Sequence, residues 1–329
     1  MHLPKNGFYF CPFLFLAALL FPVSLEAQQP FYTFPTNLTL CGEPVPLHDR
    51  KFWEMMDREF TMAVYDRAQV LLLLKRSTRF FPYIESQLKA KGMPDDLKYL
   101  MVAESALRPV VFSNKGAAGH WQFMEKTGKR FNLRKNSQMD ERLDLAKSTE
   151  AALSYLKLLY NLFGKWTLAM AAYNCGEERV KEEISQQGET DYYRLDLPQE
   201  TERYIFRILT AKVILSDPAG YGYQLPDGYA YPPEVFDLVT FQLPNPVHLR
   251  DLARGCGSFY KEIKELNVEL QGQTLSAGTH QLKIPPGKSS TCERNLKGWI
   301  KNSGGLPSPP QEGLPPTEPS SQSPLPDSQ

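Results

Sequence analysis

Residues 93–105 read MPDDLKYLMVAES, and this stretch predicts a short helix with a carboxylate on its apolar face. The proline suits the first turn of a helix, and the two aspartates after it complement the positive end of the helix dipole. Side chains at helical spacing share one face, and here they are Leu97, Leu100, Met101 and Glu104. Pro109 stops the helix. Glu104 is therefore expected near the carboxyl end of the helix, on its buried face.

This position has a chemical consequence for Glu104. Loss of water around the carboxylate and the negative end of the helix dipole both raise the pKa of a carboxyl group. A general acid that works near neutral pH needs such a raised pKa. The alternative is a buried glutamate with a structural role, satisfied by a backbone donor or an arginine, because structural pairs also perturb pKa values.

Two further stretches place polar side chains beside tight backbone turns. Residues 114–123 read NKGAAGHWQF, in which glycine and alanine allow a close backbone approach next to a tryptophan and Gln122. Residues 169–176 read AMAAYNCG, a helix end of small residues that the final glycine can cap, with Tyr173 and Asn174 projected where the helix stops. An amide beside an aromatic ring suits a sugar ligand. A plain turn between helices is the alternative for either stretch alone.

Four short motifs follow one another along the chain. They are Glu104-Ser105, Gly119-His120-Trp121-Gln122, Ala172-Tyr173-Asn174 and residues 197–204, LPQETERY. In order and spacing they resemble the successive motifs of the lytic murein transglycosylases, which belong to the goose-lysozyme-like superfamily. Residues 140–152, DERLDLAKSTEAA, are similar to the membrane-bound lytic transglycosylase D type. The resemblance covers residues 80–215 well and the preceding helices loosely.

The resemblance implies a mainly α fold with a lysozyme-like helical catalytic domain, and an enzyme that cleaves peptidoglycan. In the family, one glutamate protonates the glycosidic oxygen between N-acetylmuramic acid and N-acetylglucosamine. The same glutamate then accepts the proton of the muramoyl C6 hydroxyl, which closes on C1 as a 1,6-anhydro ring. Glu104 matches that glutamate. Because no water attacks, the second carboxylate of most glycosidases is not needed.

The resemblance also implies substrate-binding roles for six residues: Ser105, Gln122, Tyr173, Asn174, Glu200 and Tyr204. Ser105 is expected to orient the glutamate, and Tyr173 to face the developing oxocarbenium ion. Gln122 and Asn174 are expected to hold N-acetyl and hydroxyl groups. The last two residues match the closing helix motif without a defined role. No metal ion and no cofactor is expected.

Two other functions remain open at this point. A hydrolytic muramidase would need a second carboxylate to place a water molecule, and the candidates are Asp95, Asp96, Asp140 and Asp144. A peptidoglycan-binding protein without activity is the third reading. The intact motif set with Glu104 on an apolar face argues against that third reading. The chain also lacks the G-x-S-x-G and H-E-x-x-H motifs and a phosphate-binding glycine loop.

Shifts in composition divide the chain into six parts. They are a signal peptide at 1–27, an N-terminal helical extension at 28–90, the catalytic domain at 91–216, a linker at 217–233, a small domain at 234–287 and a disordered tail at 288–329. The linker is rich in tyrosine, glycine and proline. From Ser303 onward eight of the last 27 residues are proline, a composition that cannot bury a core.

The small domain is predicted to have a βααβ order. A strand near 235–241, helical stretches at 247–253 and 259–266, and a strand at 281–286 give this pattern. The unit resembles a LysM module, a family that binds glycans containing N-acetylglucosamine. Its usual opening turn with Gly-Asp is replaced here by residues 243–246, LPNP.

Composition and the amino terminus indicate an exported protein with a neutral surface. The 329 residues carry 37 basic and 37 acidic side chains, which gives no electrostatic reason to bind nucleic acid. Phe8 to Val23 is a run of 16 uncharged residues, shorter than the roughly 20 that span a membrane, and small residues follow it as in a secretory signal. Together with the peptidoglycan substrate that the resemblance implies, this signal predicts the periplasm or cell envelope of a Gram-negative bacterium, with peptidoglycan strands as the partner. Peripheral outer-membrane association stays open, and a monomer is expected.

Export also allows disulfide bonds. Removal of the signal peptide leaves four cysteines, which permit three pairings without favouring one: Cys41, Cys175, Cys256 and Cys292. Four thiols with at most one bridge is the simplest expectation.

Overall fold

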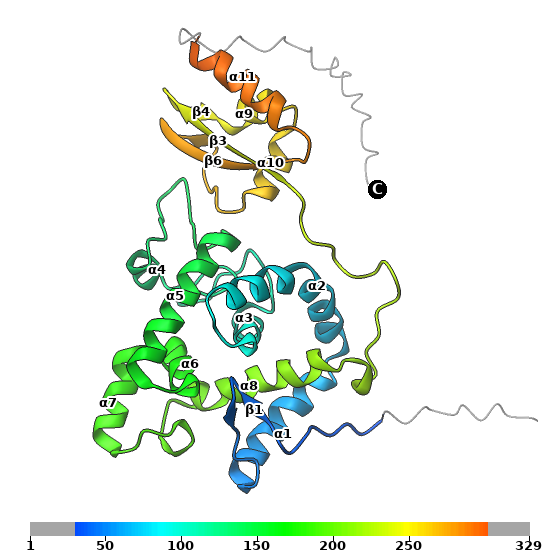
Figure 1. Ribbon diagram of the computed structural model, residues 1–329, viewed down its shortest axis with the longest axis vertical. Coiled ribbons are helices and arrows are strands. Elements are labelled where there is room, and N and C mark those ends of the chain that lie inside the picture. The colour runs from blue at the N-terminus through cyan, green and yellow to red at the C-terminus, as the bar shows by residue number, and fades with distance from the viewer. Residues whose placement is uncertain (1–29, 302–329) are drawn as a thin grey trace, which may run out of the picture. The chain divides into compact units, whose positions relative to one another are not determined.

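The computed structural model describes residues 30–301 (Figure 1). The predicted signal peptide and the tail beyond residue 301 lie outside these residues. The described residues up to Thr33 form a unit apart from the one that begins at Phe34. Within the described range, no helix combines the length and the apolarity that a membrane span requires.

The fold is mainly helical, as the sequence predicts. A short hairpin, β1 (Thr39–Leu40) with β2 (Glu43–Pro44), precedes the helices. The helices of this part are α1 (Arg50–Val64), α2 (Arg67–Ala90), α3 (Lys98–Ser105), α4 (Glu125–Arg130), α5 (Leu145–Phe163), α6 (Trp166–Cys175), α7 (Glu177–Gln187) and α8 (Gln199–Ser216). Single 3₁₀ turns occur at η1 (Asp95–Leu97), η2 (Tyr192–Arg194) and η3 (Ala219–Tyr221).

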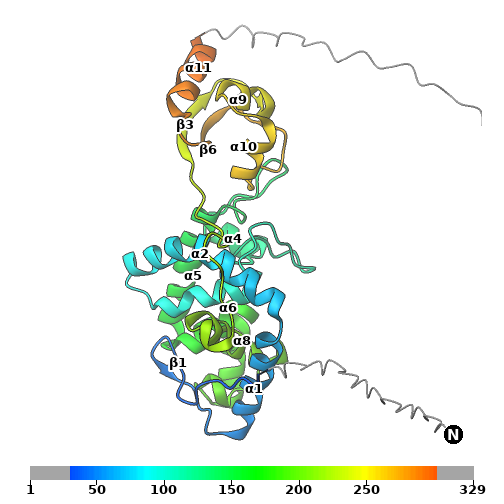
Figure 2. The ribbon, with the colours of Figure 1, turned by 90° about the vertical axis from the view of Figure 1, so that its right-hand side faces the viewer.

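Helix α8 occupies the middle of the helical part. It packs against α1 on one side and α3 on the other (Figure 1), and the turned view places α6 beside it (Figure 2). Most of its residues are buried, including Tyr204 and Phe206, because it has neighbours on several sides. Helices α5 and α6 pack against each other. On α5, Leu156 and Leu159 are buried.

The helix that carries Glu104 ends earlier than Pro109 predicts. The 3₁₀ turn η1 opens it, and α3 stops at Ser105. Ala106 and Leu107 both have a left-handed backbone, with φ of 51° and 59°. The Ala106 N–H still donates to the Val102 carbonyl, so the helix ends with a capped turn. The early end leaves Glu104 in the last turn, directly before the chain reverses.

The C-terminal region forms the small β/α unit that the sequence predicts. Strands β3 (Asp237–Leu243) and β6 (Gly278–Ile284) pair antiparallel, and β4 (Val247–His248) pairs with β5 (Thr274–Leu275). Helices α9 (Leu249–Gly255) and α10 (Tyr260–Leu266) lie between the strands in the sequence, which gives the βααβ order. Its core is apolar, with Leu249, Leu252, Ile263 and Ile284 fully buried.

The predicted disordered tail begins with a helix instead. Helix α11 (Ser289–Lys301) follows β6 and packs against β3. It is anchored because Cys292 and Leu296 are buried in the core of the small unit and Cys292 forms a disulfide with Cys256. The proline-rich composition that predicts disorder starts only after this helix. Cys41 and Cys175 are free thiols.

The predicted linker begins against α1, where the Tyr223 hydroxyl donates to the Val64 carbonyl, and continues along α2. Tyr231 stacks under two cations of that helix, with Lys75 Nζ 5.6 Å and the Arg79 guanidinium 5.3 Å from its ring centre. The Tyr231 N–H also donates to the Lys75 carbonyl, at 3.2 Å. Such cation–π contacts hold an exposed segment in place at low cost. Apart from η3, the linker composition therefore marks a segment without helix or strand that is still attached to the helices.

Candidate active site

Glu104 meets α8 at the end of α3. Its side chain is half-buried, and the Tyr204 hydroxyl of α8 donates a hydrogen bond to its Oε1. Arg207, one turn further along α8, donates to the carbonyl of Ala103 at 2.9 Å. The carboxyl group is thus held between the last turn of one helix and the face of another.

The surroundings raise the pKa of Glu104 to about 7. The largest cause is loss of water, which penalises the charged carboxylate. The Tyr204 hydrogen bond and the positive charge of Arg207 act in the opposite direction, and the negative charge of Glu200 adds to the increase. The carboxyl group is therefore divided between its acid and base forms near neutral pH, as acid–base catalysis requires.

Ser105 is buried beside Glu104, but its hydroxyl group does not hydrogen-bond the glutamate. Its hydroxyl donates to the Met101 carbonyl, one helical turn earlier, at 3.1 Å. In this arrangement Ser105 shapes the end of α3, and the direct partner of the Glu104 carboxyl is Tyr204.

The second motif forms a tight loop that only glycine permits. Gly119 has a φ of +79°, and a Cβ atom there would lie 2.0 Å from the Arg142 carbonyl oxygen. Trp121 is fully buried, and its indole N–H donates to Thr149 Oγ1 at 3.0 Å. Gln122 has a left-handed backbone with a φ of 48°, and its amide donates to the Gly119 carbonyl at 2.7 Å. The loop is thus held by these side chains and by the paired backbone hydrogen bonds between Ala118 and Phe123, at 3.1 and 3.2 Å.

Arg142 secures this loop from behind. It is buried with Asp140, at 2.7 Å, and donates to the carbonyls of Gly116 and Phe123 at 2.8 and 2.9 Å. The guanidinium therefore joins both ends of the loop. The sequence shows Arg142 within a familiar stretch but does not reveal this contact.

The third and fourth motifs are hydrogen-bonded to their neighbours. The Tyr173 hydroxyl donates to the Trp121 carbonyl at 2.8 Å, and Asn174 Oδ1 accepts from the Thr201 hydroxyl at 2.8 Å. Burial and the nearby charge of Glu104 raise the pKa of Tyr173 well above its usual range. Together with the Tyr204–Glu104 bond, these contacts bring all four motifs to one site.

Glu200 differs from the other candidates because it is exposed. It lies 4.0 Å from Lys115 Nζ, on the loop of the second motif, and is open to water. Its charge still reaches Glu104. Glu200 therefore lies at the edge of the site.

The four aspartates considered for a muramidase all have structural partners. Asp95 pairs with Lys98 at 2.6 Å, and Asp96 pairs with Lys212 at 2.8 Å. Asp140 pairs with Arg142, and Asp144 caps α5 by accepting from the Lys147 N–H at 2.8 Å. None of these partners is Glu104. Among the residues that the structure describes, no group of side chains is arranged to hold a metal ion.

Sequence reasoning missed two residues that touch this site. Thr201 binds Asn174, and Arg207 adds a positive charge near Glu104. Arg207 lies three residues after Tyr204, so helical spacing already places both on one face of α8. The missing knowledge was that α3 ends against this face, because contacts across about a hundred residues are not visible in a single sequence.

Comparison with known proteins finds a domain model that matches part of this chain. Residues 81–195 match the model of the transglycosylase SLT domain. The chain is 34% identical over 218 residues to the membrane-bound lytic murein transglycosylase D of Escherichia coli K12, and equally so to that of strain CFT073. The aligned part is 65% of this chain and 47% of the relative, so the chain spans about half the length of the curated relatives it matches.

Solved structures give a weaker similarity. An inactive mutant of the lytic transglycosylase Slt from Pseudomonas aeruginosa shares 22% identity, over 53% of this chain and 27% of that chain, with a TM-score of 0.30. The superposition at this score adds nothing to the assignment, which rests on the sequence matches. The similarity of this chain to transglycosylase SLT-domain proteins therefore rests on residues 81–195 and on the 218 residues aligned with transglycosylase D.

Proposed function

We propose that this protein is a peptidoglycan lytic transglycosylase with Glu104 as its single general acid and base. It cleaves the β-1,4 bond between N-acetylmuramic acid and N-acetylglucosamine and leaves 1,6-anhydromuramoyl ends. The observation that carries the proposal is one carboxyl group with a pKa of about 7, held by Tyr204 where the four motifs converge.

The first step uses the protonated form of Glu104. The carboxylic acid donates its proton to the glycosidic oxygen as the bond from that oxygen to C1 breaks, and positive charge develops on the muramoyl ring. A pKa of about 7 keeps much of the group protonated at neutral pH. Tyr204 fixes the direction of the carboxyl group through its hydrogen bond.

The second step uses the carboxylate that the first step leaves. Glu104 takes the proton of the C6 hydroxyl while O6 forms its bond to C1. The anhydro ring closes, and the acid form of the enzyme returns without a water molecule. Because one group serves both steps, its pKa must suit an acid and a base at the same pH.

The remaining motif residues serve substrate binding in this proposal. Gln122 and Asn174 hold N-acetyl and hydroxyl groups, and Tyr173 faces the positive charge of the ring. The rigid backbone around Gln122 and the Thr201 contact of Asn174 support these roles, since pre-organised amides lose little entropy on binding. Glu200, at the exposed edge, contacts the strand.

The product decides between this reaction and hydrolysis. Purified sacculi are digested, and the released muropeptides are analysed by mass. Anhydro products are lighter by one water than muramidase products and lack a reducing end. Reducing-end products would assign a muramidase, and absence of any turnover would leave a binding protein. The four engaged aspartates favour the anhydro product.

A matched pair of variants tests the role of Glu104. Glu104→Gln keeps the size and a hydrogen-bond acceptor but can neither donate nor accept the proton. We expect a loss of about 10⁴-fold or more, because acid and base catalysis each contribute about 10²- to 10⁴-fold. The control is Glu182→Gln, an exposed glutamate of α7, which should keep wild-type activity. Near-normal release of anhydro products by a folded Glu104→Gln variant would reject the assignment.

The location and the C-terminal unit complete the proposal. We infer export to the cell envelope from the amino-terminal sequence and from the peptidoglycan substrate; intact Met1 in a cytoplasmic fraction would contradict it.

We also infer that the βααβ unit is LysM-like and strengthens glycan binding more than chemistry. Ending the chain after Pro233 should leave turnover of short glycans and weaken retention on whole sacculi. A folded truncated protein without turnover would contradict this division.

A further inference from the structure

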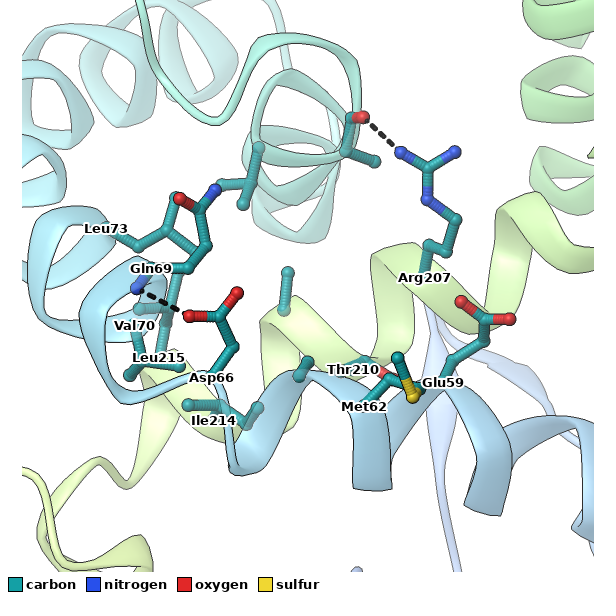
Figure 3. Close-up of a pocket in the computed structure, with 14 residues that line it drawn as sticks. Glu59, Met62, Asp66, Gln69, Val70, Leu73, Arg207, Thr210, Ile214 and Leu215 are labelled. Carbon is teal, nitrogen blue, oxygen red and sulfur yellow. Dashed lines mark hydrogen bonds between the residues drawn. The ribbon is translucent and has the colours of Figure 1, made fainter.

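A cavity lies beside the end of α3 and outside the four motifs. Helices α1, α2, α3 and α8 enclose about 340 Å³ (Figure 3). The lining is largely apolar, and much of it is small or aliphatic: Ala63, Val70, Leu73, Val102, Ala103, Ala211 and Ile214. This volume is at the lower end of the range for ligand pockets, and it suits a few amino-acid residues.

Two charged side chains face this cavity from opposite ends. Asp66 lies beside Gln69 at one end, and Arg207 lies at the other (Figure 3). Asp66 accepts from the Gln69 N–H at 3.0 Å, and Arg207 donates to the Ala103 carbonyl at 2.9 Å. Within the described part of the chain, neither side chain forms a salt bridge. Both charges are therefore available to a ligand.

The third charged residue of the lining is already neutralised. Glu59 is buried and binds Arg58 at 2.6 Å and Arg203 at 2.7 Å. It therefore contributes shape to the wall more than charge. The free charges are one negative and one positive, with an apolar floor between them.

This pattern selects the kind of ligand. A neutral glycan needs hydrogen-bond partners along its whole length, and an apolar floor leaves its hydroxyl groups unpaired at a cost. A hydrocarbon chain leaves both charges unused. A short peptide with small side chains, an ammonium group and a carboxylate group matches the floor and both ends.

We propose that the cavity binds the short peptide of a peptidoglycan strand, with an ammonium group at Asp66, small side chains on the floor and a carboxylate at Arg207. This inference rests on the proposed function, because that function brings the peptide-bearing strand to Glu104. Ala103 and Arg207 line the cavity; Ala103 directly precedes Glu104, and the charge of Arg207 acts on Glu104, so the cavity lies beside the end of α3 that carries the glutamate.

Occupancy of the cavity also affects the glutamate. The positive charge of Arg207 favours the charged form of Glu104 and lowers its pKa. A ligand carboxylate at Arg207 offsets that charge, so the acid form of Glu104 becomes more populated. The pH above which the rate of cleavage falls is then higher for peptide-bearing strands than for bare strands.

Binding is tested with full-length protein that carries Glu104→Gln, so that no turnover interferes. The probe is N-acetyl-L-Ala-γ-D-Glu-meso-diaminopimelic acid, titrated by calorimetry. Asp66→Asn keeps the helix cap of α2 but removes the charge, and Arg207→Gln removes the opposite charge. Each should weaken binding about two- to fivefold, as expected for exposed charges. Ala63→Leu fills the cavity and should weaken binding at least about tenfold.

A charge far from the cavity serves as the control. Arg194→Gln removes an exposed arginine outside the lining and should leave the affinity unchanged. Equal binding by all variants, or no binding by the parent protein, would overturn the proposal. A chitin oligosaccharide is added as a competitor. If it displaces the peptide and its own binding is weakened as much by Ala63→Leu, the cavity holds glycan and the proposal is overturned. If Ala63→Leu fails to fold, the two charge variants decide.

Turnover separates this inference from the proposed function. With Glu104 restored, Ala63→Leu should slow the cleavage of peptide-bearing strands and leave that of peptide-free strands unchanged. Absence of anhydro products from peptide-free strands with the wild-type protein would refute the proposed function and leave the binding result intact. Equal rates of Ala63→Leu and wild type on both substrates would refute the peptide site alone.

Discussion

At the scale of single residues, the Tyr204–Glu104 contact determines how the site responds to pH. The tyrosine is buried on α8, and its hydroxyl favours the charged form of the carboxyl group. Burial acts in the opposite direction and has the larger effect. The pKa of about 7 is thus a balance, and each side of it can be changed by one substitution.

Tyr204→Phe should move the activity to higher pH. Without the hydroxyl, the pKa of Glu104 rises above about 7, and the pH at which kcat/KM falls should increase by about one unit. The measurement is a pH profile on soluble glycan strands. Tyr160→Phe on α5 is the control and should leave the profile in place. A profile that stays unchanged or moves to lower pH in Tyr204→Phe would contradict the balance described here.

Glu104→Gln should also change stability in a pH-dependent way. The folded pKa of about 7 lies above the ordinary value of 4.5, so the native state prefers the neutral carboxyl. This stability is complete below pH 4.5 and is lost as pH rises to about 7. The variant avoids that loss, and at pH 8 it should be more stable than wild type by about 1–3 kcal/mol. Urea unfolding at pH 4.5 and pH 8 measures the difference, and an equal offset at both values would reject it.

At the scale of elements, the loop of the second motif depends on one backbone approach. Gly119 has no room for a side chain, because a Cβ would collide with the Arg142 carbonyl. The same loop contains Gly116, which has a φ of +87° but open space around it. Substituting each glycine by alanine thus distinguishes the free-energy cost of the collision from that of the positive φ.

Gly119→Ala should destabilise the protein by about 2–4 kcal/mol and lower its activity. Gly116→Ala should cost only about 1 kcal/mol, because it bears the positive φ alone. Thermal unfolding and turnover of both variants provide the comparison. Equal losses in the two proteins would show that the approach to Arg142 does not limit the loop.

At the scale of the whole molecule, one disulfide closes the C-terminal unit. Cys256 and Cys292 are 36 residues apart, and the bond attaches α11 to the core of the βααβ unit. Cys292→Ser should destabilise this unit by about 2–4 kcal/mol, since the open chain gains entropy when unfolded. Cys175→Ser, which removes a free thiol, is the control. Limited proteolysis should cut the C-terminal unit of Cys292→Ser faster than that of Cys175→Ser. Equal rates of cleavage in the two variants would contradict the prediction.

Local patterns in the sequence predict the elements and indicate which domain residues 80–215 resemble. Helical spacing places Glu104 on an apolar face, and the order of the motifs indicates the domain. The order of strand-like and helix-like stretches predicts the βααβ unit. These features are local, since propensity, capping and periodicity act within a few residues of one another. The same local reasoning placed the end of α3 too late, at Pro109, and began the disordered tail before α11, because buried contacts set both limits.

Which residues contact one another across the fold depends on the tertiary structure. The partner of Glu104 is Tyr204, a hundred residues away, and Ser105 next to it bonds its own helix. The choice of Cys256 with Cys292 and the cavity beside Arg207 likewise depend on how helices and strands pack. Packing sums many weak contacts between distant segments, so a single sequence can supply the residues of a site but not their pairing.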